Sequence, residues 1–243
     1  MGSWRRAEAA TPPALRTRLG LVAALAALVV LSLGVLYAGD STPGAWDARI
    51  GTATYDVGPS WRHVALALDF LGEPAGSAAL VVAAVAGFLL LRRPRAAVLL
   101  VVGAALTVGT ATLLKSLVGR TIHGDNLSYP SGHTAFATAV ALVVALTAAG
   151  RSGLGRTAGL SLVLAAAMAA GAAMGWAQVA LGAHYPTDVL GGWCTALAVT
   201  PATALVVDRL GDRFGDRPAD RAVDGPAEAP ADRTADTGRR VGH

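Results

Sequence analysis

The chain has 243 residues, of which 53% are hydrophobic and only 15% are charged. This composition is too apolar for an ordinary soluble domain and predicts an integral membrane protein with one membrane domain. The formal net charge of +4 comes almost entirely from arginine. The arginines form short clusters between apolar runs without interleaved aromatic residues, which argues against nucleic-acid binding. The only cysteine, Cys194, lies inside an apolar run, so no disulfide framework is expected.

Six apolar runs reach the length of about 17 to 20 residues that crosses the hydrocarbon core of a bilayer. Each run is predicted to be a helix, because an unpaired backbone cannot cross lipid. Their many small residues allow close helix packing. The predicted fold is therefore all-α, a polytopic membrane six-helix bundle with spans at residues 19–38, 75–91, 96–114, 134–150, 157–181 and 189–207.

The segments around these spans complete the predicted organisation. Residues 1–18 are expected to be a cytoplasmic N-terminal segment, residues 19–210 the membrane domain and residues 211–243 a disordered cytoplasmic tail, since the tail has hardly any large apolar residue. Within the loop 39–74, an amphipathic helix at the membrane interface is expected around residues 61–68. A cleaved signal peptide is the alternative for the first span, because that run begins after several arginines.

Arginine clusters flank the spans on one side only. Because six crossings alternate, every cluster falls on the same side, which the positive-inside rule identifies as cytoplasmic. The prediction is a multi-pass plasma-membrane protein with both termini in the cytoplasm and with the loops 39–74, 115–133 and 182–188 facing outward. The clusters are Arg5, Arg6, Arg16 and Arg18; Arg92, Arg93 and Arg95; Arg151 and Arg156; and Arg209 and Arg213.

Two histidine segments lie at the predicted outward ends of spans. Pro130-Ser131-Gly132-His133 precedes the fourth span, and His184 and Asp188 precede the sixth. A spacing of four places His184 and Asp188 on one face of a helical turn. A carboxylate bound to one imidazole nitrogen fixes the tautomer and makes the other nitrogen a better nucleophile. His133 supplies a second imidazole, which can act as a general acid, so one histidine is expected to attack and the other to donate a proton.

The neighbouring residues suit an anion. Ser131 and Gly132 stand at a predicted helix start, where exposed N–H groups bind anions. Lys115, the only lysine, ends the third span and supplies a formal charge, and Arg120 can supply a planar, bidentate one. Phosphoryl transfer needs positioning, charge neutralisation, an attacking group and a proton donor, so the predicted ligand is a phosphate.

These residues resemble the motifs of the type 2 phosphatidic acid phosphatase superfamily, between Lys115 and Asp188. The motifs are Lys, six residues, Arg-Pro; Pro-Ser-Gly-His; and Ser-Arg, five residues, His, three residues, Asp. The resemblance implies a bundle of the lipid phosphatase and vanadium haloperoxidase type, with a membrane lipid as substrate, no obligate protein partner, no metal and no other cofactor. By the same resemblance His184 is the nucleophile that forms a phosphohistidine, Asp188 orients it, His133 is the acid, and Lys115, Ser131 and Gly132 bind phosphate.

Both motif arginines are replaced in this chain. Ile122 and Gln178 stand at their positions, and His123 replaces the proline of the first motif. Losing one such phosphate donor costs about 3 to 4 kcal/mol. Arg120 is expected to compensate, because residues two apart in an extended loop point the same way. Gln178 can still donate a neutral hydrogen bond, whereas His123 is equally well explained as a site residue or as a solvated loop residue. Restoring arginine at 122 and 178 is expected to raise the activity if the site is only weakened.

The predicted function is metal-independent hydrolysis of a lipid phosphate monoester or diphosphate at the outer membrane face. Polyprenyl phosphate or diphosphate, phosphatidic acid and phosphatidylglycerol phosphate are all candidate substrates, and the missing arginines favour a monoester. The alternative is a non-catalytic lipid-phosphate-binding or scaffold protein derived from this family. A small transporter is less consistent with the sequence, because the ionisable groups gather at one face instead of the midplane.

Overall fold

The computed structural model describes residues 9–55 and 58–215. Within them the chain forms eight α-helices and one short antiparallel strand pair. The strands β1 (Thr121–Ile122) and β2 (Asn126–Leu127) pair Thr121 with Leu127 and Ile122 with Asn126. The helices are α1 (Arg16–Leu36), α2 (Ala45–Thr54), α3 (Pro59–Phe70), α4 (Pro74–Leu90), α5 (Pro94–Val118), α6 (Gly132–Arg151), α7 (Arg156–Ala180) and α8 (Pro186–Gly215).

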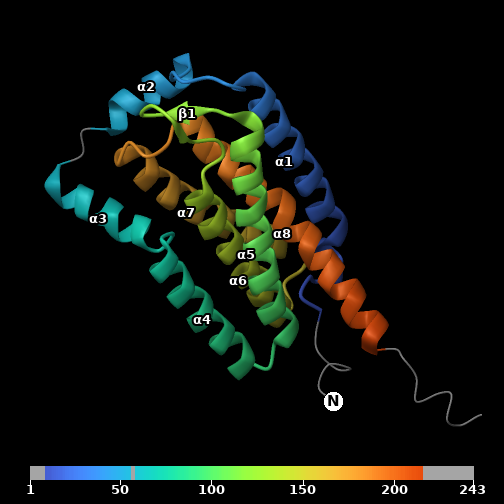
Figure 1. Ribbon diagram of the computed structural model, residues 1–243. Helices are drawn as coiled ribbons and strands as arrows, with labels where there is room; N and C mark the ends of the chain where they lie inside the picture. Colours follow the sequence, from blue (N-terminus) through green and yellow to red (C-terminus); the bar gives the residue numbers. More distant parts are fainter. Residues whose placement is uncertain (1–8, 56–57, 216–243) are drawn as a thin grey trace, which may run out of the picture.

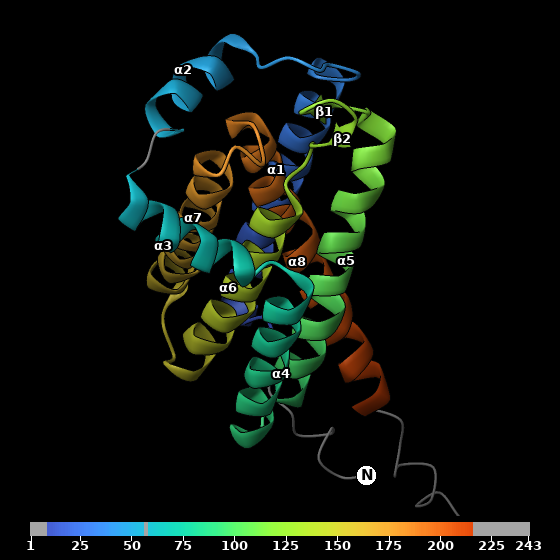
Figure 2. The same ribbon diagram turned by 60° about the vertical axis from the view of Figure 1, so that its left-hand side comes forward.

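Helix α6 lies at the centre of the bundle. It packs against α5, α7 and α8, while α8 also packs along α1 and α5 (Figures 1 and 2). The buried face of α6 consists mainly of small and branched apolar residues, among them Ala139, Leu142 and Leu146. Such residues allow the neighbouring helices to approach closely. The all-α bundle expected from the sequence is confirmed.

Among the described residues, five helices are each long and apolar enough to cross a membrane: α1 with the turn before it, α5, α6, α7 and α8. The second predicted span corresponds to α4, which has only 17 residues. It follows α3 after a bend of 64°, and α3 and α4 pass the same test only when taken together (Figure 1). Pro74 suits the start of α4, because an N–H at the first helical position would have no intrahelical acceptor. The predicted six spans therefore include one bent pair.

The outward loops contain more structure than the sequence indicated. The helix expected around residues 61–68 is present as α3, but α2 and the strand pair were not predicted. Gly119 ends α5 with a left-handed φ of 67°, and Gly124 in the β1–β2 turn has a φ of 87°. Strands of two residues are too short to show the alternation by which strands are recognised, so this hairpin leaves no periodic signal.

The ends of three helices meet around Asp208 in α8. Its buried carboxylate accepts hydrogen bonds from the backbone N–H groups of Ala10 (2.7 Å) and Thr11 (2.9 Å). It also lies 3.8 Å from Arg16 and 3.9 Å from Arg95. The start of α1, the start of α5 and the end of α8 therefore share one end of the bundle, as alternating spans require.

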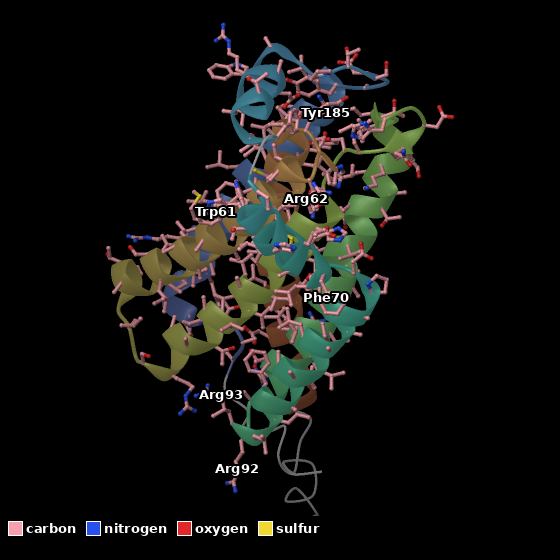
Figure 3. All side chains as sticks on the ribbon, turned by 90° about the vertical axis from the view of Figure 1, so that its left-hand side faces the viewer. Trp61, Arg62, Phe70, Arg92, Arg93 and Tyr185 are labelled. Carbon is pink, nitrogen blue, oxygen red and sulfur yellow. The ribbon has the colours of Figure 1, made fainter. Side chains whose placement is uncertain are left out.

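The opposite end of the bundle carries Tyr185. Figure 3 shows Tyr185 near one end of the molecule, and Arg92 and Arg93 at the other. The assignment of these ends to the two sides of a membrane stays a prediction. Helix α8 continues to Gly215, so residues 211–215 of the predicted tail are helical. The rest of that tail and residues 1–8 lie outside the described residues.

Candidate active site

The two histidine segments touch through the backbone. The N–H of Ser131 donates a hydrogen bond to the carbonyl oxygen of Asp188 at 2.9 Å. Helix α8 comes so close here that a Cβ atom at Gly192 would lie 2.2 Å from the Ser131 carbonyl oxygen. Glycine is therefore required at position 192 for this contact. As expected from the sequence, the start of α6 and the first turn of α8 lie together.

His184 and Asp188 form a buried pair at the start of α8. His184 Nδ1 lies 3.7 Å from Asp188 Oδ2, within ion-pair distance but too far for a hydrogen bond. Asp188 is fully buried, and its Oδ2 also accepts the Tyr185 N–H at 3.0 Å. Burial lowers the pKa of His184 below its ordinary value, and the opposing effect of Asp188 is smaller. The imidazole is therefore neutral near neutral pH, which is the form that can act as a nucleophile.

Arg120 contacts this pair through Asp188. Its guanidinium donates to Asp188 Oδ1 at 2.6 Å, to Asp47 Oδ2 at 2.7 Å and to the Thr187 hydroxyl at 2.7 Å. The side chain is fully buried. Burial alone would lower the pKa of Arg120, but Asp188 and Asp47 raise it overall. In this arrangement two carboxylates match the charge of Arg120, so its role as a phosphate ligand stays a prediction.

Asp47 is a buried residue of the site region that the sequence analysis missed. It lies in the first turn of α2, and its carboxylate accepts the Thr187 N–H at 2.8 Å and the Thr187 hydroxyl at 2.9 Å. The Arg120 guanidinium lies between the rings of Tyr37 and Tyr185, with ring centroids at 4.1 and 4.5 Å. The region from the end of α1 to α2 therefore closes over the first turn of α8. No motif in the sequence distinguishes Asp47 from other loop carboxylates.

Ser131 and Gly132 begin α6 as predicted. The Ser131 hydroxyl is buried and caps the helix, accepting from the Thr134 N–H at 3.4 Å and the Thr134 hydroxyl at 3.1 Å. The space beside Gly132 is open, since no neighbouring side chain comes within 4 Å of a Cβ atom at that position. An open helix start with free N–H groups can accept an anion.

Lys115 lies at the end of α5 and contributes its charge to the same region. Its Nζ donates to the carbonyl oxygen of Leu127 at 3.0 Å. Burial is the main cause of the lowered pKa of His184, and the charges of Lys115 and His133 lower it further. The structure therefore brings His184, Asp188, His133 and Lys115 together, as the spacing of the motifs suggested.

His133 faces two carboxylates that the sequence analysis did not consider. Its Nε2 lies 3.5 Å from Asp69 Oδ1 and 3.5 Å from Glu73 Oε1, on either side of the α3–α4 bend. The amide of Gln178 in α7 donates to Asp69 Oδ1 at 2.7 Å and is buried. Gln178, a candidate phosphate donor, therefore binds a carboxylate in the structure. The available sequence signal was the pair Asp69 and Glu73, four residues apart just before a predicted span.

Asp69, Glu73 and His133 are also the one group in the described part of the chain that could hold a metal ion. One ligand atom from each lies within 4.8 Å of the others. Carboxylate oxygens together with an imidazole suit several divalent metals. Glu73 is about half exposed, however, and acidic side chains at such positions commonly have no metal.

His123 lies in the β1–β2 turn, beside the His184 region. It is exposed, and its Nε2 is 2.8 Å from the Gly182 carbonyl oxygen. It lines an open cavity of about 360 Å³ together with Ile122, Arg62 and Tyr185. Arg62 comes from α3 (Figure 3), so this cavity contains a cation together with Ile122.

An apolar groove of about 270 Å³ adjoins the His133 region. It lies where the α3–α4 bend faces α6 and α7, and its lining is almost entirely hydrophobic. Asp69 is next to Leu68 in the sequence, and Gln178 is one helical turn from Met174, so the polar cluster stands at the edge of this groove. Its lining includes Leu68, Leu71, Phe136, Val140, Ala173 and Met174.

Comparisons with known proteins agree with the fold. A family model described as the PAP2 superfamily matches residues 15–212. The chain is also similar to a solved structure, described as the first transmembrane PAP2 type phosphatidylglycerolphosphate phosphatase from Bacillus subtilis. The two share 22% identity with a TM-score of 0.61, over 79% of this chain and 96% of the other. No curated protein sequence matches the chain.

Proposed function

Because the chain belongs to the PAP2 superfamily, we propose that it hydrolyses a lipid phosphate through a phosphohistidine at His184. Family membership supports phosphatase activity in general, and the apolar helices support a multi-pass membrane protein. The observation that carries the specific proposal is the buried, neutral His184 beside Asp188, with His133 and Lys115 close by. These groups supply a nucleophile, its orienting carboxylate, an acid and a cation.

The first step forms a bond between His184 Nε2 and phosphorus. Asp188 faces Nδ1, so Nε2 is the nitrogen with the free electron pair. The bond from phosphorus to the leaving oxygen breaks, and that oxygen takes a proton from His133. Lys115 and the N–H groups at the start of α6 stabilise the phosphate oxygens.

The second step returns His184 to its free form. A water molecule gives a proton to His133 as its oxygen attacks phosphorus, and the bond between phosphorus and Nε2 breaks. The products are inorganic phosphate and neutral His184, while His133 is protonated again. No metal ion takes part in either step.

The apolar groove beside His133 suits the tail of a lipid substrate. Its hydrophobic lining lies between α3–α4, α6 and α7, and the polar cluster stands at its edge. The head group can then reach the histidines while the tail stays in an apolar environment. Phosphatidylglycerol phosphate is a candidate because the Bacillus subtilis protein is described as acting on it. Phosphatidic acid and polyprenyl phosphates or diphosphates are the other candidates.

A non-catalytic lipid-phosphate binder is the competing function. Ile122 is buried, Gln178 binds Asp69, and Arg120 is paired with two carboxylates, so none of them supplies the missing arginine charge. A pure binder, however, does not need a neutral imidazole oriented by a buried carboxylate. This contrast makes phosphate release the decisive measurement.

Phosphate release from purified protein over a panel of these lipids tests the proposal. Wild type is expected to release phosphate from at least one lipid, with or without a chelator, and His184→Ala is expected to reduce release to background. His63→Ala serves as the matched control, since His63 is an exposed histidine on α3. Lipid binding without release from any lipid would favour the binder, and equal rates for His184→Ala and wild type would contradict the mechanism.

A further inference from the structure

We propose that Asp69 is a positioning residue for the proton donor His133 and is itself held in place by Gln178. The inference rests on the proposed function and concerns the same reaction. Nothing in the motifs of the chain points to Asp69, which lies outside the stretch from Lys115 to Asp188. Its role follows from the contacts that the α3–α4 bend makes with α6 and α7.

The geometry around His133 places its Nε2 toward negative charge. Asp69 Oδ1 and Glu73 Oε1 are both 3.5 Å from this nitrogen. Within the described residues, the buried Nε2 has no hydrogen-bond partner at shorter range. Catalytic hydrogen bonds are often long before substrate binds and shorten in the complex. A fixed carboxylate oxygen at this distance, as Asp69 provides, favours a proton on Nε2.

Asp69 is better fixed than Glu73. The Asp69 side chain is 25% exposed and accepts a hydrogen bond from the buried Gln178 amide at 2.7 Å. The Glu73 side chain is 51% exposed. A carboxylate held by a buried donor loses less conformational freedom on contact with His133 than a mobile one. Asp69 is therefore expected to set the orientation of the ring.

The backbone of the bend also fits the imidazole. Gly72 lies between the two acids, and a Cβ atom at this position would come within 2.1 Å of His133 Cδ2. The ring therefore packs directly on the glycine backbone. The Asp69 carboxylate and the Gly72 backbone together hold one nitrogen and one side of the His133 ring.

This arrangement assigns different nitrogens to the two histidines. In His184, Nδ1 faces its carboxylate and Nε2 attacks. In His133, Nε2 faces its carboxylate, so Nδ1 donates the proton to the leaving oxygen as the bond to phosphorus breaks. Nε2 keeps its proton throughout, and His133 becomes a neutral ring protonated at Nε2. Water later returns a proton to Nδ1.

A comparison of two substrates separates this role from a structural one. A lipid phosphate has a poor alkoxide leaving group and needs the acid, whereas p-nitrophenyl phosphate has a good leaving group and needs it little. Asp69→Asn is expected to lower kcat on the lipid by about 10- to 100-fold and kcat on p-nitrophenyl phosphate by less than about threefold, since general acids contribute roughly 10²- to 10⁴-fold. The KM for the lipid is expected to stay unchanged.

Glu73→Gln is the matched control, because it removes the other carboxylate at the same distance. It is expected to change kcat on either substrate by less than about threefold, whereas Gln178→Leu should follow Asp69→Asn in direction. Equal losses on both substrates, or a Glu73→Gln loss as large as that of Asp69→Asn, would overturn the proposal.

A second measurement does not depend on turnover. The chain has only five histidines, so ¹⁵N-histidine NMR with His133→Gln can assign the His133 signals. The wild-type ring is expected to carry a proton on Nε2, and Asp69→Asn, but not Glu73→Gln, is expected to shift the Nε2 signal. An unchanged signal in Asp69→Asn would refute the positioning role even if the protein is an active phosphatase.

The same spectra distinguish a failure of the proposed hydrolysis from a failure of the positioning contact. If wild type releases no phosphate but Asp69→Asn still shifts the His133 signal, the hydrolysis proposal fails and the positioning contact stands. If added Mg²⁺ or Zn²⁺ shifts the His133 signal and increases phosphate release, the three residues form a cation site and the positioning proposal is wrong.

Discussion

Arg120 joins three segments of the chain through one guanidinium group. It connects Asp47 of α2 with Thr187 and Asp188 of α8, while Arg120 itself follows α5. All the charges involved are fully buried. Removing one member of such a group is costly because the remaining charges stay buried without a partner. The residue therefore stabilises the fold and fixes the carboxylate that orients His184.

We predict that Arg120→Met lowers the free energy of unfolding by about 3–5 kcal/mol. The reason is that Asp47 and Asp188 would then repel each other in a buried space. Unfolding of the detergent-solubilised protein measures the loss, and Arg49→Met is the matched control because Arg49 is exposed on α2. A variant with normal stability but a raised KM would instead identify Arg120 as a phosphate ligand.

The protonation of His184 predicts the acid side of the pH profile. Burial lowers its pKa below the ordinary value of 6.5, so the neutral nucleophile persists below that pH. The acid limb of kcat/KM is therefore expected below pH 6.5. Asp188→Asn removes the group that raises this pKa and should move the limb to still lower pH, at a reduced rate.

The same shift has a defined sign for stability. The folded state binds fewer protons at His184 than the unfolded state between the lowered pKa and 6.5, so the contribution of His184 to stability falls as the pH drops through this window.

Measurement of kcat/KM against pH for wild type and Asp188→Asn checks the predicted acid limb. An acid limb above 6.5, or one that Asp188→Asn leaves in place, would exclude His184 as its origin.

The α3–α4 bend is the element that brings carboxylates to the site. Gly72 is the residue of this bend that touches the His133 ring. We predict that Gly72→Ala displaces the ring and lowers kcat on a lipid phosphate by about 10²-fold or more, because general acids contribute roughly 10²- to 10⁴-fold. Gly87→Ala in α4 is the control, since a Cβ atom there meets nothing within 4 Å.

The kcat of both glycine variants is the measurement, with circular dichroism to verify that the helices are retained. Unchanged kcat in Gly72→Ala would show that His133 can move without loss of function. It would then also weaken the proton-donor assignment.

The bend changes what is expected from restoring the motif arginines. An arginine at 178 would meet Asp69, which already receives the Gln178 amide, and would form an ion pair there. Ile122 is 6% exposed and lines the same cavity as Arg62, so the side chain of an arginine at 122 would have to extend into that cavity. From these contacts we therefore expect a smaller gain in activity from Gln178→Arg than from Ile122→Arg.

The helices and the family could be predicted from sequence because both leave local signals. Runs of apolar residues indicate spans, and the spacing of His184 and Asp188 indicates a shared helical face. Asp47 left no such signal, and the spacing of Asp69 and Glu73 did not reveal their partners, because these contacts with α6, α7 and α8 are distant in sequence. The pairing of Arg120 with carboxylates was not predicted for the same reason, because its side-chain hydrogen-bond partners are 67 to 73 residues away.

At the scale of the whole molecule, Asp208 stabilises the end of the bundle opposite the site through its contacts with Ala10, Thr11, Arg16 and Arg95. We predict that Asp208→Ala lowers the free energy of unfolding by about 2–3 kcal/mol, because two buried N–H groups lose a charged acceptor. Asp212→Ala is expected to cost less, since the Asp212 side chain is 54% exposed. Thermal unfolding measures both variants, and phosphate release at low temperature should be unchanged in each. A loss of activity without a loss of stability in Asp208→Ala would contradict this assignment.

The short α4 has a consequence for where in the bilayer the reaction takes place. Helix α4 ends and helix α5 begins at the same connection, but α4 has 17 residues and α5 has 25. At 1.5 Å per residue, α4 is about 26 Å long, which is less than the hydrocarbon thickness of about 30 Å. Measured from their shared connection, α4 therefore reaches about 12 Å less far than α5. Where α4 crosses without α3, the bilayer beside it becomes thinner or lets water in. A phosphate head group can meet His133 at that depth, so the lipid need not be lifted out of its leaflet.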